Sequence, residues 1–259
     1  MSMSMRNTSQ RREQILELLV KHGAVQVAEL VPKLGVSAVT IRTDLGALES
    51  QGLVTRSYGG ARLTRTPPTE QNIHQKDNIN TALKEHIGTA AAKLVEPGDN
   101  IIIDSGTTTQ HMARHLRGLD RVTVMTNGLN IAWELADVPG LTLMLTGGQL
   151  RKESLSIQGV QAEACLDAYS FDKLFLGVDG LDLQFGATTH HEAEASLNAR
   201  MVARAKKVIV LTDASKFGRV SLHRIVMLDR VHAVVTDESI SAEYREGLQR
   251  MGIELIIAA

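Results

Sequence analysis

Small polar residues and glycines follow several strand-like runs in the larger part of the chain. The clearest case is "DSGTTT" (104–109), which comes directly after the apolar run 100–103. Backbone NH groups and hydroxyls at the start of a helix bind phosphate, and glycine allows close approach. Related turns follow other runs at "TNG" (126–128), "TGG" (146–148), "DG" (179–180) and "TD" (212–213). Ligands bind beyond the carboxyl ends of strands in open α/β sheets, so these turns predict one polar pocket.

The residue types in these turns indicate a phosphorylated sugar as the ligand. Lys216 is a candidate cation for the phosphate, and Asp104, Asp179 and Asp213 can accept hydrogen bonds from sugar hydroxyls. The sequence has no Gly-x-x-x-x-Gly-Lys-Ser/Thr, and no Gly-x-Gly-x-x-Gly follows a strand, so no nucleotide cofactor is predicted. Helix capping and tight turns explain any single Thr or Gly equally well, and it is the number of such turns that favours a site.

Two histidine clusters could suggest a metal. His111 and His115 are spaced i, i+4 but lack the internal Glu of a zinc protease helix, so they are expected on a solvated helix surface. The run 190–194, "HHEAE", has no third element at ligand spacing. His191 and Glu194 are therefore predicted to contact sugar, and no metal is predicted.

Trp133 is expected in the core, on the helix that follows "TNG".

The same pocket residues leave catalysis open. Ketose–aldose isomerisation needs a general base and a group that stabilises the enediolate, and Glu194, Asp179 and Lys216 could supply both. The pocket alone therefore fits either an isomerase or a sensor. The sequence of the N-terminal region is needed to distinguish the two functions.

The first 63 residues have the pattern of a winged helix-turn-helix. Ile41, Leu45 and Leu48 define the buried face of a third helix, which follows a turn at Gly35. Two β-like runs, 53–57 and 61–63, then form a basic hairpin, and a winged domain of this kind reads DNA with its third helix. The alternative is a helical interaction module with a solvated charged face. The predicted DNA contacts are Ser37, Val39, Thr40, Arg42, Thr43, Arg56, Tyr58 and Arg62.

Charge and composition agree with a division of labour. Residues 1–66 carry nine Lys and Arg against five Asp and Glu, a net charge of +4, while the remainder carries −5. A basic head on an acidic body indicates that only the head meets a polyanion. Residues 64–81, with Pro67 and Pro68, are predicted to be a linker. Cys165 is the only cysteine, and no apolar run suits a signal peptide or a membrane span, so a cytoplasmic protein is expected.

Residues 82–259 alternate between strand and helix patterns. Strand-like runs separated mostly by helix-length segments predict an α/β domain with a largely parallel sheet. The runs are 100–103, 122–125, 141–145, 173–178, 207–211, 233–235 and 254–257.

Both regions resemble one known family. "RREQILELLVKHGAVQVAEL" and "LGVSAVTIRTDLGALESQGLVTRSYGGA" resemble the DNA-binding domain of the DeoR family of bacterial transcriptional regulators. "DSGTTT", "TNG", "TGG", "GVDGLD", "EAEA" and "TDASKF" resemble its sugar-phosphate sensor domain, which is related in fold to ribose phosphate isomerase. "VTIRTDL", "LFLGVDGLDL" and "THHEAEASLNARM" are most similar to repressors of N-acetylgalactosamine and galactosamine use.

The resemblance implies a repressor of a carbohydrate (amino-sugar) catabolic operon, without cofactor or enzymatic activity. Its implied partners are double-stranded operator DNA, a phosphorylated sugar effector such as an amino-sugar or ketose phosphate, and a second copy of itself in a dimer or tetramer, but no membrane. The alternative is a sugar-phosphate isomerase with an appended DNA-binding domain. The predicted effector-binding residues are Asp104, Ser105, Gly106, Thr107, Thr108, Thr126, Asn127, Gly147, Gly148, Asp179, Gly180, His191, Glu194, Asp213 and Lys216.

Overall fold

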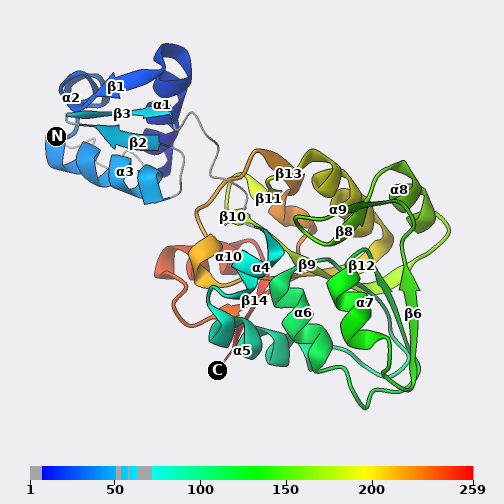
Figure 1. Ribbon diagram of the computed structural model, residues 1–259. Helices are drawn as coiled ribbons and strands as arrows, with labels where there is room; N and C mark the ends of the chain where they lie inside the picture. Colours follow the sequence, from blue (N-terminus) through cyan, green and yellow to red (C-terminus); the bar gives the residue numbers. More distant parts are fainter. Residues whose placement is uncertain (1–7, 51–53, 58, 64–71, 259) are drawn as a thin grey trace. The chain divides into compact units, whose positions relative to one another are not determined.

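A computed structural model describes residues 8–50, 54–57, 59–63 and 72–258 (Figure 1). The chain divides into two compact units, residues 1–70 and 71–259. No helix within the described ranges is long and apolar enough to cross a bilayer.

The smaller unit is a winged helix-turn-helix, as predicted. In its described part the wing strands pair with a further short strand, in the antiparallel order β1-β3-β2. The sequence analysis did not find β1, because three residues are too few to show an alternating pattern. Gly35, with φ of 66°, ends the second helix in the left-handed conformation that glycine favours. The elements are α1 (Thr8–His22), β1 (Ala24–Gln26), α2 (Val27–Leu34), α3 (Ala38–Ser50), β2 (Val54–Ser57) and β3 (Gly60–Leu63).

The third helix of this unit has one buried and one exposed face. Ile41, Leu45 and Leu48 are buried against Ile15 and the other apolar side chains of the small core. Val39, on the opposite side of α3, is 70% exposed. The helical period therefore assigned both faces of α3 correctly.

The larger unit is built on a parallel sheet. Within the described residues the sheet has seven strands in the order β15-β14-β12-β9-β4-β5-β6, and all neighbouring pairs run parallel. Each of the seven strand-like runs in the sequence is one of these strands. They are β4 (Asn100–Ile103), β5 (Val122–Thr126), β6 (Leu141–Leu145), β9 (Phe171–Gly177), β12 (Ala205–Leu211), β14 (Ala233–Asp237) and β15 (Glu254–Ala258).

Helices cover both faces of this sheet, so its strands are apolar on both sides (Figure 1). Alternate residues of β4 show the division: Ile101 and Ile103 belong to one core cluster and Ile102 to the other. The first cluster is covered by α5 (Thr81–Ala92), α6 (Thr107–Arg114) and α7 (Leu129–Leu135). The second is covered by α8 (Val160–Leu166), α9 (Glu192–Arg204) and α10 (Ala242–Arg250).

The prediction that Trp133 lies in the core is wrong. Its side chain is 83% exposed on α7, whereas Ile131 and Leu135 of the same helix are buried. Trp133 stands two residues from each of them, so it lies on the other side of the helix. Hydrophobicity alone suggested the core, but the helical phase places this side chain in solvent.

A short helix lies in the second half of the predicted linker. In α4 (Ile73–Asp77) the Asn72 side chain accepts a hydrogen bond from the Gln75 backbone, and the Gln75 side chain accepts one from the Asn72 backbone. A helix of five residues is too short to show a hydrophobic period, which is why the sequence suggested a linker through residue 81. Residues 64–71 lie outside the described residues.

Within the described part of the larger unit, two small antiparallel sheets accompany the parallel sheet. One has the order β10-β11-β13 and the other is a hairpin of β7 and β8. They were not predicted, because strands of three or four residues carry little pattern. Their bounds are β7 (Gln149–Arg151), β8 (Ser156–Gln158), β10 (Gly180–Asp182), β11 (Gly186–Thr189) and β13 (His223–Val226).

The strand order changes direction beside β4. From β4 the chain continues outward through β5 and β6, and then returns to place β9, β12, β14 and β15 on the other side of β4. The carboxyl ends of β4 and β9 therefore flank a topological switch point, where open α/β sheets form ligand crevices.

Candidate functional site

A cavity of about 240 Å³ lies at this switch point. Residues that follow β4, β9 and β12 contribute to its lining, as expected for strand ends that meet at one sheet edge. Among the predicted effector residues, the lining includes Asp104, Ser105, Gly106, Thr107, Thr108, Asp179, Glu194, Asp213 and Lys216.

Two of the other predicted residues stand behind the pocket wall. The Asn127 side chain accepts a hydrogen bond from the Ser105 backbone nitrogen at 3.0 Å, and its Nδ2 lies 3.4 Å from Ser105 Oγ. Thr126 Oγ1 donates to the Ile103 carbonyl at 2.6 Å. Both side chains therefore fix the turn after β4 from the neighbouring strand and are absent from the lining of the cavity.

Four more predicted residues are also absent from the lining. Gly147 and Gly148 follow β6, which lies at the edge of the described sheet, two strands from β4. Gly180 begins β10, where an added Cβ would lie 2.3 Å from the Arg219 carbonyl oxygen. His191 is the N-cap residue of α9 and precedes Glu194 by three positions. Small polar residues and glycines that follow a strand therefore do not all line the pocket.

The pocket contains more cations than the sequence suggested. Lys76, Lys84 and Arg219 line it together with Lys216. Burial lowers the pKa of Lys84 and of Lys216. Lys84 is only 4% exposed, on the side of α5 that also buries Ile87. A lysine in phase with the apolar face of a helix is the pattern that could have identified it.

Asp104, Asp179 and Glu194 place carboxyl groups in the same pocket, and Lys76 Nζ lies 2.7 Å from Asp179 Oδ1. Burial raises the pKa of Asp104 to about 7. Burial, with the charges of Asp179 and Asp104, raises the pKa of Glu194 to about 8. Burial alone would also raise the pKa of Asp179, but the charges of Lys76, His190 and Lys216 outweigh it and lower the value to about 2. At neutral pH Asp179 is a carboxylate, while Glu194 retains its proton and can donate it in a hydrogen bond.

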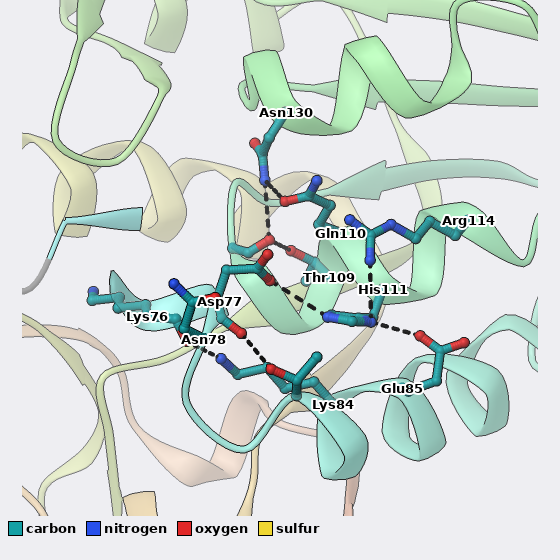
Figure 2. A network of polar contacts seen from close by, with 12 residues as sticks. Lys76, Asp77, Asn78, Lys84, Glu85, Thr109, Gln110, His111, Arg114 and Asn130 are labelled. Carbon is teal, nitrogen blue, oxygen red and sulfur yellow. Dashed lines mark hydrogen bonds and ion pairs between the residues drawn. The ribbon is translucent and has the colours of Figure 1, made fainter. Parts of the chain in front are cut away.

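The N-terminus of α6 faces the pocket with the "DSGTTT" turn. Gly106 is its N-cap residue, and backbone NH groups in the first turn have no partner within a helix. Thr109 Oγ1 donates to the Asp104 carbonyl at 2.6 Å. Asn130 Nδ2 donates to the Gly106 carbonyl at 3.2 Å, and Figure 2 shows Asn130 and Thr109 on this side of α6. These bonds hold the turn rigidly, with the positive end of the helix dipole at the cavity.

The expectation that the helix carrying His111 presents a solvated surface is wrong for this residue. His111 is 2% exposed, because α5 packs on α6. Its Nδ1 lies 2.6 Å from Glu85 Oε2, and its Nε2 lies 3.4 Å from Asp77 Oδ1 (Figure 2). The hydrogen bond with His111 lowers the pKa of Glu85, to which His115 also contributes. No group of three His, Cys, Asp or Glu that could hold a metal occurs among the described residues.

The exposed side of α3 carries the predicted DNA contacts. Val39, Arg42 and Thr43 are exposed there, with Thr40 half-buried. Ser37 Oγ accepts a hydrogen bond from the Thr40 backbone nitrogen at 3.2 Å and so caps α3.

The described part of the wing adds two arginines. Arg62 is exposed on β3, and Arg56 is exposed on β2, where its guanidinium lies 3.8 Å from the Glu49 carboxylate. Tyr58 lies outside the described residues. Arg11 and Arg12 have a different position, because both bind the buried Asp44, at 2.5 and 3.1 Å. Basic residues of this unit therefore divide into exposed and structural groups.

In comparisons with known proteins, each of the two units matches a known domain family. Residues 11–66 match the DeoR-like helix-turn-helix domain, and residues 79–238 match the DeoR C-terminal sensor domain. A protein of Escherichia coli O157:H7 named as an aga operon transcriptional repressor is 48% identical over 96% of this chain and 94% of its own length. The transcriptional repressor GlcR of Bacillus subtilis (strain 168) is 34% identical, with 94% and 93% covered.

A solved structure was also compared. Ribose 5-phosphate isomerase from Plasmodium falciparum aligns over 53% of each chain with 14% identity and a TM-score of 0.41, which is too low to bear on function. The family assignment depends instead on the domain matches and the full-length relatives. On these grounds the chain belongs to the DeoR family of transcriptional regulators, with a helix-turn-helix domain followed by a sensor domain.

Proposed function

We propose that this protein represses an operon for carbohydrate catabolism and that a phosphorylated sugar bound in the pocket releases it from operator DNA. The observation that carries the proposal is that one pocket brings together cations, a helix start and carboxyl groups. Lys84 and Lys216 line it together with the start of α6, and this combination suits a phosphate. Asp104, Asp179 and Glu194 line it as well, and carboxyl groups suit sugar hydroxyls.

The effector is proposed to be an amino-sugar phosphate, with a ketose phosphate as the alternative. The sequence motifs that resemble repressors of galactosamine use favour the amino sugar. The carboxylate of Asp179 also supports it, because an ammonium group can bind there.

For DNA, we propose that α3 enters the major groove of the operator. Val39 and Thr43 would then face base edges, while Arg42, Arg56 and Arg62 would contact phosphates. Self-association through the larger unit would place two DNA-binding units on half-sites about one helical turn apart, about 10 base pairs. A tetramer would allow more distant operators to be joined.

The test uses the full-length protein. An operator is selected from a pool of random DNA duplexes, and its affinity is measured by fluorescence anisotropy with and without each member of a sugar-phosphate panel. The panel contains galactosamine 6-phosphate, N-acetylgalactosamine 6-phosphate, fructose 6-phosphate and ribose 5-phosphate. The expected result is that at least one amino-sugar or ketose phosphate weakens DNA binding about tenfold or more.

Two outcomes would contradict the proposal. If the selection yields no preferred DNA sequence, the protein has no specific operator. If no member of the panel changes DNA affinity, the proposal of a sugar-phosphate effector is wrong. The same panel is assayed for interconversion of ketose and aldose phosphates. Efficient turnover would favour the isomerase with an appended DNA-binding domain.

A further inference from the structure

The short helix α4 is attached to the larger unit at both ends. At its start, the Ile73 backbone nitrogen donates to the Glu153 carbonyl at 2.7 Å, and the Ile73 side chain is buried. At its end, Lys84 Nζ donates to the Lys76 carbonyl, and Asp77 lies beside His111 (Figure 2). Polar contacts at both ends and a buried apolar side chain therefore hold α4 against the larger unit.

The groups that hold α4 are also pocket groups. Lys84 and Lys76 both line the cavity, and Lys76 Nζ lies 2.7 Å from Asp179 Oδ1. An anion in the cavity would compete with Asp179 for Lys76 and with the Lys76 carbonyl for Lys84. Occupancy of the pocket and the position of α4 thus depend on the same two lysines.

His111 connects α4 to the phosphate turn. It lies on α6, whose first residues line the cavity, and its Nε2 is directed at Asp77 of α4 (Figure 2). The other ring nitrogen is held by Glu85 of α5, so the imidazole has a fixed orientation. No hydrogen bond joins His111 Nε2 to Asp77 Oδ1, but the two atoms lie 3.4 Å apart where α4 packs on α6, so a ligand at the start of α6 can act on the end of α4 through this contact.

In the chain, α4 is also the element that follows the DNA-binding unit. That unit extends to Glu70, and the capping residue of α4 is Asn72. Any shift of α4 changes the point from which the chain leads to the DNA-binding unit. This relation follows from covalent continuity and requires no contact between the two units.

We propose that α4 couples the pocket to the DNA-binding unit, with Lys76 as the positioning residue that responds to an anionic ligand. The proposal depends on the proposed function, because it presumes that a sugar phosphate changes DNA affinity. It adds the element through which the change is passed on. The coupling requires that the ligand bind with different affinity when α4 lies as described and when α4 has shifted.

The test measures ligand affinity and coupling separately. Galactosamine 6-phosphate and fructose 6-phosphate are the probes, calorimetry gives their Kd, and anisotropy gives the Kd for operator DNA with and without saturating probe. The ratio of the two DNA constants is the coupling ratio. For the wild type we expect a ratio of about 10 to 100.

The first variant weakens α4 without changing a pocket residue. In Asn72→Ala/Gln75→Ala the capping box is lost, and neither residue lines the cavity. We expect the probe Kd to stay within about threefold of the wild type while the coupling ratio falls to about 1 to 3. Lys216→Met is the matched control: it should weaken probe binding about tenfold or more, yet keep the wild-type ratio at saturation.

A second variant protects the test against a folding defect. Six Gly and Ser residues inserted immediately before Asn72 leave α4 intact and add a flexible segment between α4 and the DNA-binding unit, so the ratio should again fall while probe binding is kept. A wild-type ratio in both variants would overturn the role of α4 and leave the proposed function standing. Failure of both probes to bind the wild type would instead overturn the proposed function and the coupling with it.

Discussion

The Asp104 carboxyl group at the end of β4 accepts a hydrogen bond from the Gly177 backbone nitrogen at the end of β9, with 3.2 Å between Oδ2 and N. This bond spans the switch point of the sheet, and both residues line the cavity. Asp104 is only 1% exposed, and its Oδ1 has no hydrogen-bond partner within the described structure. A buried acid with one unused oxygen is suited to a polar ligand and is costly to ionise.

Stability should depend on pH through this carboxyl group. Burial raises its pKa from 3.8 to about 7, so the folded state binds more protons than the unfolded state between these values. The free energy of unfolding should therefore fall as the pH rises from about 4 to about 7, and Glu194 should extend the fall to about 8. Thermal melts of the wild type and of Asp104→Asn check this. The variant should lose less stability over the range, whereas Glu192→Gln, which changes an exposed residue, should follow the wild type.

Lys84→Met should weaken sugar-phosphate binding, although Lys84 lies on α5 and not on one of the turns that follow the strands. A charge-assisted hydrogen bond contributes about 1.5 to 3 kcal/mol, so the Kd should rise about tenfold to a hundredfold. Calorimetry measures the change. Lys93→Met, at the exposed end of the same helix, is the control and should leave the Kd unchanged. Equal affinities for Lys84→Met and the wild type would remove Lys84 from the anion site.

Two arginines of the smaller unit should respond differently to truncation. Arg42→Ala removes an exposed cation, so DNA affinity should fall, and the slope of log affinity against log salt should decrease by about 1. Arg11→Ala removes one of the two arginines that bind the buried Asp44, so it should destabilise the unit by about 1.5 to 3 kcal/mol, with Arg12 still paired. Salt titration of DNA binding and denaturant unfolding separate the two effects. A stable Arg11→Ala protein with reduced DNA affinity would place Arg11 at the DNA instead.

Gly88→Ala should disturb the packing of α5 on α6. An added Cβ would lie 2.6 Å from the backbone carbon of His111 and 2.6 Å from the Met112 nitrogen, which cannot move independently of α6. Overpacking of this kind costs about 1 to 3 kcal/mol, and the phosphate turn at the start of α6 should shift with it. Thermal melts and the probe Kd report the two effects. Ala90→Gly, also on α5, is the control and should lower the free energy of unfolding by only about 1 kcal/mol. Gly98→Ala would not serve as a control, because Gly98 has a positive φ that a side chain would strain.

The sequence predicted the parts of this protein that depend on local pattern. The seven strands of the parallel sheet each have an apolar run of adequate length, and the period of α3 separates Ile41 from Val39. The turn after β4 was also found, because glycine and hydroxyl residues follow a buried strand. These features are encoded within a few neighbouring residues.

Other parts depend on contacts between distant segments. Lys76 reaches the pocket because α4 folds against Asp179, more than a hundred positions away, and no local pattern reports such a contact. His111 is buried because α5 covers α6, a contact that the sequence around His111 does not report. Its i, i+4 spacing with His115 therefore suggested a solvated helix surface. Trp133 shows the converse error, since a large apolar residue was assigned to the core without regard to its helical phase.

The exposed indole on α7 has a practical consequence. Trp133 is the only tryptophan of the chain, so the intrinsic fluorescence selected at long excitation wavelengths comes from a single known place on the larger unit. In a single copy of the chain its emission maximum should be that of an indole in water. Dilution of the protein will then reveal, without any label, whether a second copy shields this helix: a spectrum that moves to longer wavelength on dilution means that it does.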